Sequence, residues 1–179
     1  PGFIDTHANI AIGGRALAHF VNGQAETVGS LERLLEVIRK TTSEVEEGTW
    51  INIHGGHVFS RKVPENRFPT LAEFDAAAPD HPTLFMDTSH RFLYNSYALK
   101  ALGITRESDG EASGIVERDP VTGEPTGGCL ECKANFPAFS VPAEEVKQDV
   151  GGIVTEWVKK GYTSVNSIGL RTDLDALIA

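Results

Sequence analysis

Several side chains that could bind a metal or move a proton stand directly after short apolar runs that are typical of strands. These residues are His7, Asp87, His90 and Asn166. The carboxyl ends of parallel strands lie at one edge of a sheet, so neighbouring strands would bring these groups together. For any one of them alone, an ordinary polar strand end is the simpler interpretation. The set predicts a polar site at one sheet edge, built from separate segments.

The first of these residues, His7, lies in a pattern related to a metal-binding pair. Side chains two positions apart on a strand point to the same side, so a His-x-His pair can hold one metal ion. Here the second position is Asn9, whose neutral amide oxygen is a much poorer zinc ligand than an imidazole. We therefore expect less than one tightly bound zinc ion per chain.

Three further groups could carry chemistry, and each has a simpler interpretation. His54 and His57 flank a Gly-Gly pair, where a weak metal pair is conceivable but a solvent-exposed loop is favoured. Glu131 lies between Cys129 and Cys132, where it is either a carboxylate ligand or a surface charge. A single Cys-x-x-Cys pair is a weak zinc signal, so we expect two reduced thiols.

Alternating strands and helices must position these groups. One helix is capped by Ser30, carries apolar residues at i, i+3, i+4 and i+7, and is predicted to end at Gly48. A Thr-x-x-Glu capping box predicts a shorter helix from Thr70 to Ala78. Residues 11–29 are predicted to form a long loop with at most one helical turn. The other predicted elements are buried strands at 2–5 and 162–165, strands at 50–54 and 83–86, helices at 95–102 and 141–160, a hairpin at 114–127, and a last helix from Thr172 or Asp173.

The alternation of strands and helices favours an α/β fold over a sandwich. With 179 residues, 40% of them hydrophobic and 23% charged, the chain is expected to form one domain, 1–179. The net charge of −9 argues against nucleic acid or an anionic membrane as a main partner. No signal peptide or membrane-spanning run is visible, so we expect a cytoplasmic protein. Because Pro1 opens inside a strand pattern, we also expect a fragment.

A set of short segments, in order along the chain, resembles one family. They are PGFIDTH at 1–7, WI at 50–51, FPTLAEFD at 68–75 with APD at 78–80, SH at 89–90, NS at 95–96 with AL at 98–99, GI at 103–104, ERD at 117–119, GEPTG at 123–127 with Glu131, and GYTSV at 161–165. Together they resemble the amidohydrolase superfamily, in particular the branch often called amidohydrolase family 3, the YtcJ-like metal-dependent hydrolases. The likeness covers nearly the whole chain.

The resemblance implies a (β/α)8 barrel, present here as a partial TIM-like barrel with an inserted β-hairpin at about 105–130. It also implies a divalent metal, with zinc the first choice, that activates a water for attack on an amide-type C–N bond. On this basis His7 and Glu131 are expected metal ligands and His90 is an expected substrate contact. Asp87 is the expected catalytic carboxylate, because it is the only obvious carboxylate at a strand end.

The sequence departs from the family pattern at Asn9, and at Asn166 and Ser167, where relatives often have His-Asp. The family's other ligands lie further along a longer chain, as the resemblance implies. One hypothesis is therefore an amidohydrolase with a small-molecule substrate, here truncated and with an incomplete site. The alternative is a non-catalytic, metal-free domain of amidohydrolase origin. Open strand edges favour a homo-oligomer in either case, and we expect no amidase turnover from this chain alone.

Overall fold

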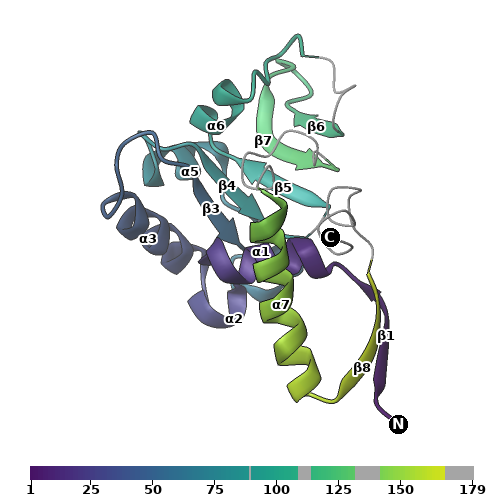
Figure 1. The fold of residues 1–179 in the computed structure, drawn as a ribbon. Helices are drawn as coiled ribbons and strands as arrows, with labels where there is room; N and C mark the ends of the chain where they lie inside the picture. Colours follow the sequence, from purple (N-terminus) through teal and green to yellow (C-terminus); the bar gives the residue numbers. More distant parts are fainter. Residues whose placement is uncertain (89, 109–113, 132–141, 168–179) are drawn as a thin grey trace. The chain divides into compact units, whose positions relative to one another are not determined.

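The computed structural model describes the chain except for residues 89, 109–113, 132–141 and 168–179. The chain divides into two compact units. The first unit is formed by Pro1–His19 with Phe136–Ala179, and the second unit by Phe20–Asn135 (Figure 1). The predicted mixed α/β class is confirmed, whereas the single domain stays a prediction.

The second unit contains a six-stranded sheet with the order β2-β3-β4-β5-β7-β6. Its strands are β2 (Val21–Asn22), β3 (Ile51–His54), β4 (Thr83–Met86), β5 (Arg91–Tyr94), β6 (Ile115–Arg118) and β7 (Pro125–Leu130). β2, β3 and β4 run parallel, whereas β4–β5, β5–β7 and β6–β7 are antiparallel pairs. Ile53 and Phe85 in the parallel part are fully buried. Branched and aromatic side chains therefore fill the centre of this sheet, as their strand preference predicts.

Short helices complete the second unit. They are α2 (Ala25–Val28), α3 (Leu31–Thr42), α4 (Phe59–Lys62), α5 (Leu71–Ala77) and α6 (Ser96–Ala101). Leu34 and Ile38 of α3 are fully buried in one apolar cluster with Phe59 and Phe85. The rings of Phe59 and Phe85 meet edge to face, with their centroids 5.1 Å apart, a geometry that stabilises beyond area burial. All members of this cluster belong to the second unit.

Side-chain caps set the starts of three of these helices. Ser30 Oγ accepts a hydrogen bond from the backbone N–H of Arg33. Thr70 and Glu73 form the reciprocal capping box that their spacing predicts. Asn95 caps α6. The helices predicted at these positions are confirmed.

The end of α3 differs from the prediction, because the helix stops at Thr42 and not at Gly48. The hydroxyls of Thr41, Thr42 and Ser43 donate to backbone carbonyls three or four residues earlier. Such bonds compete with the helical backbone pattern. Gly48 instead has a φ of 81° in the turn that follows. The predicted boundary is wrong because it took glycine as the only stop signal.

The hairpin predicted at 114–127 is confirmed as the antiparallel pair β6–β7. Asp119 Oδ1 accepts hydrogen bonds from the backbone N–H groups of Val121 and Thr122 at 2.9 and 2.8 Å, which fixes the turn. The same N–H groups hold the pKa of the Asp119 carboxyl below its ordinary value. β7 continues to Leu130 and so carries Glu131 to the end of the strand.

The first unit contains a parallel pair of strands, β1 (Phe3–Ala8) and β8 (Tyr162–Ser167), with helices α1 (Ile10–His19) and α7 (Ala143–Lys159). Ile10 and Ala11 of α1 are buried in one cluster with Val150 of α7. Phe3 and Ile4 of β1, in contrast, are 65% and 67% exposed. The prediction of a buried strand here is wrong, because these apolar side chains remain open to solvent.

Helix α1 replaces about the first half of the loop predicted at 11–29, and β2 and α2 lie in the rest, so that prediction is wrong. Glycine lowers helix propensity, which is why the Gly13–Gly14 pair indicated a loop. A Cβ at Gly14 would lie only 2.8 Å from the backbone oxygen of Asp149 on α7. The missing side chain therefore lets the two helices approach, and this packing outweighs the propensity.

The buried face of α7 differs in part from its prediction, which placed Val146, Val150, Val154, Trp157 and Val158 on one side. Val154 and Val158 are exposed, at 37% and 63%. Ile153 packs against the buried cluster with Val146 and Trp157. The stripe followed a four-residue spacing, which drifts around a helix of 3.6 residues per turn.

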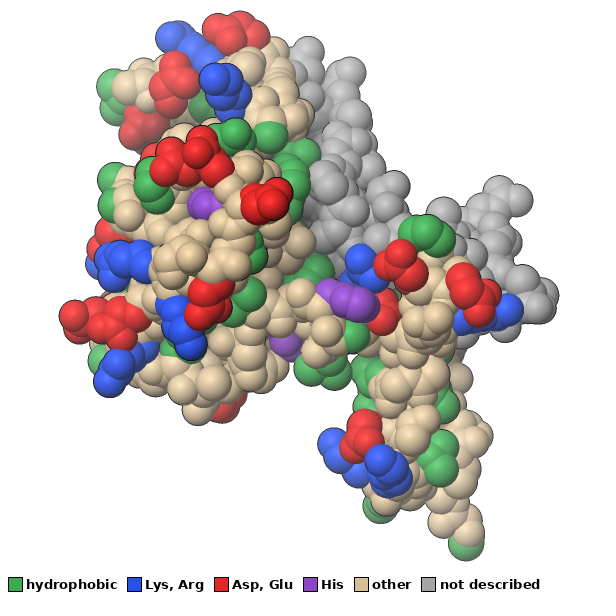
Figure 2. All heavy atoms as spheres, turned by 60° about the vertical axis from the view of Figure 1, so that its left-hand side comes forward, with side chains coloured by type: hydrophobic (Ala, Val, Ile, Leu, Met, Phe, Trp, Pro, Cys, Tyr) green, Lys and Arg blue, Asp and Glu red, His purple; other side chains and the backbone are tan. Residues whose placement is uncertain are grey.

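Acidic and basic side chains lie side by side over the face shown in Figure 2. Two ion pairs of the second unit are Arg33–Glu36 and Lys62–Glu26, with N–O distances of 2.8 and 2.6 Å. Exposed pairs of this kind contribute little to stability. Within the described part of the chain, no helix combines the length and apolar character that crossing a membrane requires.

Candidate functional site

The carboxyl ends of four strands of the second unit lie at one edge of its sheet. β2, β3 and β4 are parallel, and two successive antiparallel pairings through β5 give β7 the same direction (Figure 1). The strands end at Asn22, His54, Met86 and Leu130. This edge, here called the polar edge, is where open α/β sheets place ligands. Asp87, His90 and Glu131, all predicted site residues, follow two of these strands.

Asp87 is buried and follows β4 directly. Its Oδ1 accepts a hydrogen bond of 2.6 Å from the backbone N–H of Phe59, the first residue of α4. Burial raises the pKa of this carboxyl, against the opposing effects of the Phe59 N–H and of the charges on Arg91, His57 and Lys62. A carboxyl in this state is suited to hold and release a proton, although one oxygen also serves to cap α4.

His90 and Glu131 lie together, 41 residues apart in sequence. His90 Nδ1 donates to Glu131 Oε1 at 2.5 Å, and the Glu131 backbone N–H donates to the His90 carbonyl at 2.7 Å. The pairing of β5 with β7 creates this contact, since it joins Arg91 to Leu130. A carboxylate on Nδ1 orients the ring and leaves Nε2 with its lone pair. The two side chains are 60% and 54% exposed and so are accessible to a ligand.

His54 is a polar-edge residue that the sequence analysis considered only as half of a weak metal pair with His57, and for which it favoured a solvent-exposed loop. It ends β3 and is half-buried, whereas His57 is exposed as expected. Its Nδ1 lies 3.4 Å from the amide nitrogen of Gln24, which comes from the segment after β2. Burial lowers the pKa of the His54 imidazole. Its position at the end of a strand, the same signal that selected His90, could have found it.

Residues with strained, left-handed backbone conformations also lie at the polar edge. Val58 has φ 55° and ψ 44°, a left-handed conformation that is rare for a β-branched residue. Glu131 has a φ of 60°, which is also in the left-handed region. Strained conformations cost free energy and cluster at functional sites. Val58 directly precedes Phe59, so the strained segment supplies the N–H group that binds Asp87.

Comparison with known proteins shows the family of this chain. All of residues 1–179 match the sequence model of the amidohydrolase family. The chain belongs to this family. No solved structure matches the chain.

One curated relative of this amidohydrolase-family chain is an N-substituted formamide deformylase from Arthrobacter pascens, which is 35% identical over 140 residues. A second is Protein LONG AFTER FAR-RED 3 from Arabidopsis thaliana, which is 28% identical over 161 residues. A third is the putative amidohydrolase YtcJ from Bacillus subtilis (strain 168), which is 26% identical over 143 residues. These matches cover 76%, 89% and 79% of the chain, but only 24%, 24% and 26% of the relatives. The chain thus spans about a quarter of their length.

The predicted metal ligands fall in different units. His7 is an exposed residue of the first unit, where its backbone N–H donates to Asp5 Oδ1 at 3.0 Å. Glu131 belongs to the second unit. Asn166 is likewise an exposed residue of the first unit. The structure brings together His90 and Glu131, whereas the pairing of His7 with Glu131 in one metal site stays a prediction.

A metal site needs three or more suitable donors in one place. No group of three His, Cys, Asp or Glu side chains that could hold a metal ion occurs among the described residues. In the second unit, the carboxylate of Glu131 already accepts from His90. The described residues alone do not fit a complete zinc centre. Cys132 lies outside the described residues, and Cys129 is disulfide-bonded, so the reduced thiol predicted for Cys129 is wrong.

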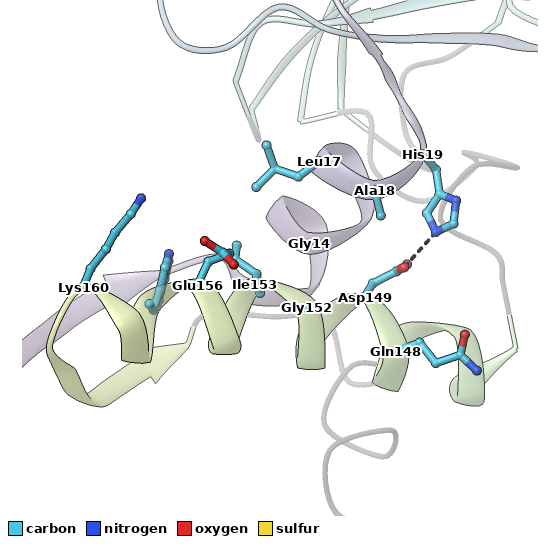
Figure 3. A pocket seen from close by; sticks show the side chains of 11 residues that line it. Gly14, Leu17, Ala18, His19, Gln148, Asp149, Gly152, Ile153, Glu156 and Lys160 are labelled. Atoms are coloured by element: carbon cyan, nitrogen blue, oxygen red, sulfur yellow. Dashed lines mark hydrogen bonds and ion pairs between the residues drawn. The ribbon is translucent and has the colours of Figure 1, made fainter.

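The first unit has a pocket of about 420 Å³ between α1 and α7. Figure 3 shows that Leu17 and Ala18 of α1 face Ile153 of α7 across it. At one end His19 Nε2 donates to Asp149 Oδ1 at 2.7 Å. No sequence signal indicated this pocket, because its lining comes from two helices about 130 residues apart, one of them predicted as a loop.

Proposed function

We propose that this chain contributes part of the active site of a hydrolase that cleaves an amide-type C–N bond, and that the substrate binds at the polar edge. The main support is that the His90–Glu131 pair and the buried Asp87 follow strands that end at one sheet edge, in a chain that belongs to the amidohydrolase family. The family barrel, with the sheet of the second unit as part of it and the hairpin at about 105–130 as an insertion, is part of this proposal.

His90 and Asp87 take different roles at the polar edge. Glu131 holds the proton of His90 on Nδ1, so Nε2 is the atom that accepts a proton from the attacking water. Asp87, the predicted catalytic carboxylate, supplies a proton to the departing nitrogen, because burial raises its pKa and favours the protonated form. His90 also remains the expected substrate contact. Amide hydrolysis requires both a proton acceptor and a proton donor, and these residues provide one of each.

A divalent metal is the cofactor that membership of the family implies. When bound it would polarise the carbonyl and acidify a water. His7 and Glu131 stay the proposed ligands, but the described residues do not bring three donors together. The proton transfers proposed above therefore involve no metal. The metal site of this chain by itself is expected to be incomplete.

The first relative suggests the substrate class. Its name states that it removes the formyl group from N-substituted formamides. We extend this class to the present chain, because a small amide needs only a few donors and acceptors, and the polar edge offers them. The expected substrate is an N-substituted formamide or a related small acyl amide.

A second candidate is a non-catalytic domain of amidohydrolase origin. Asn9 in place of a histidine and the missing third donor among the described residues favour it. The exposed Phe3, Ile4 and Val158 of the first unit would suit contact with a second copy of the chain. This candidate predicts a stable oligomer without substrate binding.

Titration of the chain with an N-alkylformamide separates the two candidates. Histidine side-chain NMR signals report binding residue by residue. We expect saturable shifts of the His90 and His54 signals, with no shift of His19 in the first unit. In parallel assays with zinc or manganese in excess, we expect no turnover above buffer.

The outcomes are distinct. Absence of any shift in a folded chain, with a stable dimer by light scattering, would favour the non-catalytic domain. Turnover that disappears in His90→Ala and in Glu131→Gln would show that the site is already complete, contrary to our expectation.

A further inference from the structure

We propose that Gln24 fixes the hydrogen of His54 on Nε2, so that this imidazole acts as a hydrogen-bond donor to the oxygen of the amide substrate at the polar edge. Gln24 is then a positioning residue and His54 a residue that contacts substrate. This inference rests on the proposed function for the identity of the ligand. The tautomer of His54 does not depend on it.

Hydrogen bonds fix the backbone of Gln24. Its N–H donates to Asn22 Oδ1 at 3.0 Å, and its carbonyl accepts from the N–H groups of Thr27 and Val28 at 2.8 and 3.0 Å. Its side chain passes over Gly56, where an added Cβ would lie 3.2 Å from Gln24 Cγ. The glycine therefore leaves room for the glutamine, which reaches His54 from the segment between β2 and α2.

The contact between the two side chains selects one tautomer. Gln24 Nε2 is an amide nitrogen with two hydrogens and can only donate. Its partner, His54 Nδ1, must then be the ring nitrogen with the lone pair. The ring hydrogen of the neutral imidazole accordingly sits on Nε2. Burial lowers the pKa of His54, which keeps the ring neutral at physiological pH.

The N–H group of His54 Nε2 is available to a ligand. Of the residues that the structure describes, none accepts a hydrogen bond from this atom, and the atom is not sealed in the interior. A donor at the carboxyl end of β3 lies on the same edge as the Nε2 lone pair of His90 after β4. One imidazole therefore donates and the other accepts.

The role of such a donor follows from the chemistry of amides. Attack on the carbonyl carbon places negative charge on the oxygen, and a fixed N–H group stabilises that charge without moving. His54 gives a hydrogen bond only, and its proton stays on the ring. A metal could take Nε2 only if the hydrogen moved to Nδ1, which would break the contact with Gln24 nitrogen. The geometry thus favours donation over metal binding for this histidine.

The test reads the tautomer directly, by NMR of chain labelled with ¹⁵N at histidine, near pH 7.5. His81 is an internal reference with the opposite tautomer, because its Nδ1 donates to the carbonyl of Thr49 at 3.2 Å and the residue is buried. We expect His54 to show a protonated Nε2 and a bare Nδ1, and His81 the reverse. A protonated Nδ1 on His54 in the unaltered chain would overturn the proposal.

Two variants sharpen the test. Gln24→Glu replaces the donor by a carboxylate that only accepts, so the His54 hydrogen should move to Nδ1 while His81 stays unchanged. Gln148→Glu, the same substitution on α7 of the first unit, should leave both histidines as they are. If Gln24→Glu leaves His54 unchanged, Gln24 does not position the ring and the proposal fails.

Binding separates this inference from the proposed function. If the amide binds as proposed, Gln24→Glu should weaken the affinity for an N-alkylformamide about two- to tenfold, the worth of one hydrogen bond. The Gln148→Glu control should bind normally. If the tautomer is as expected but no formamide binds, the proposed substrate fails while the tautomer assignment stands. If binding is normal in Gln24→Glu despite a switched tautomer, the donor role of His54 is overturned.

Discussion

The two units of this chain achieve their structure in different ways. The second unit buries a cluster of aliphatic and aromatic side chains around a six-stranded sheet. The first unit has a small apolar cluster and joins its two helices through a buried carboxylate, Asp149, which accepts from both Arg15 and His19. The stability of the second unit therefore depends on apolar burial, whereas that of the first unit depends on a charged contact.

The largest expected effect is loss of a core ring from the second unit. Phe85→Ala removes a fully buried side chain that packs on Phe59. We expect a loss of about 3–5 kcal/mol in the free energy of unfolding. Phe3→Ala, on the 65% exposed Phe3 of the first unit, should cost less than about 1 kcal/mol. Urea denaturation of both variants tests the difference, and equal losses would refute the contrast between the units.

A smaller but still clear effect is expected at the charged contact of the first unit. Asp149→Asn leaves Arg15 without its nearly buried carboxylate partner, whose side chain is 6% exposed. Because Arg15 and His19 are themselves partly exposed, we expect a cost of about 2–3 kcal/mol, below that of a fully buried pair. Hydrogen exchange should show loss of protection in α7.

The matched control uses the second carboxylate on Arg15. Glu145 also accepts from Arg15, at 3.1 Å, but its side chain is 49% exposed. Glu145→Gln should therefore change the free energy of unfolding by less than about 1 kcal/mol. If Asp149→Asn were as mild as this control, the first unit would not depend on the buried charge.

A modest effect with a defined pH dependence is expected at the capping box of α5. Bonds from Arg67 and from Thr70 lower the pKa of Glu73 to about 2 in the folded chain. A lowered pKa stabilises the fold above the ordinary Glu value and loses that contribution as pH falls. Glu73→Gln should cost about 1 kcal/mol or less at pH 7, because the side chain is 34% exposed and solvent screens its charge. The cost should shrink between about pH 5 and pH 2; a constant difference would contradict the pKa.

The smallest expected effect concerns the amount of zinc bound per chain. We expect less than one zinc per chain by elemental analysis after dialysis against a weak chelator, since no three-donor group occurs among the described residues. Asn9→His should raise zinc affinity only if His7 lies near further donors. Stoichiometric zinc in the unaltered chain would contradict this expectation.

The sequence predicted the second unit better than the first, and the reason is physical. Local signals decide features such as the Ser30 cap, the Thr70–Glu73 box and the strand Thr83–Met86, and all of these are confirmed. Helix α1 was missed because Gly14 is favourable only against the backbone of α7. That contact joins residues about 130 positions apart, which no local pattern contains.

The candidate site likewise has features that local sequence patterns predict and features that they do not. Strand ends selected His90 and Asp87 from sequence, because apolar runs followed by polar groups are local patterns. The partner of His90, Glu131, is set by the pairing of β5 with β7. The partner of His54, Gln24, comes from the segment after β2 and is 30 residues away. Residue positions were therefore predictable, whereas their hydrogen-bond partners and tautomers were not.

The glycine that follows His54 limits how this protein could be redesigned. A Cβ at Gly55 would lie 2.2 Å from the ring of Phe85, and the Gly55 N–H donates to the Met86 carbonyl at 2.8 Å. Any larger residue would have to displace a ring at the centre of the apolar cluster. A library that aims to alter ligand preference should therefore keep Gly55 fixed and vary His57, whose side chain is exposed.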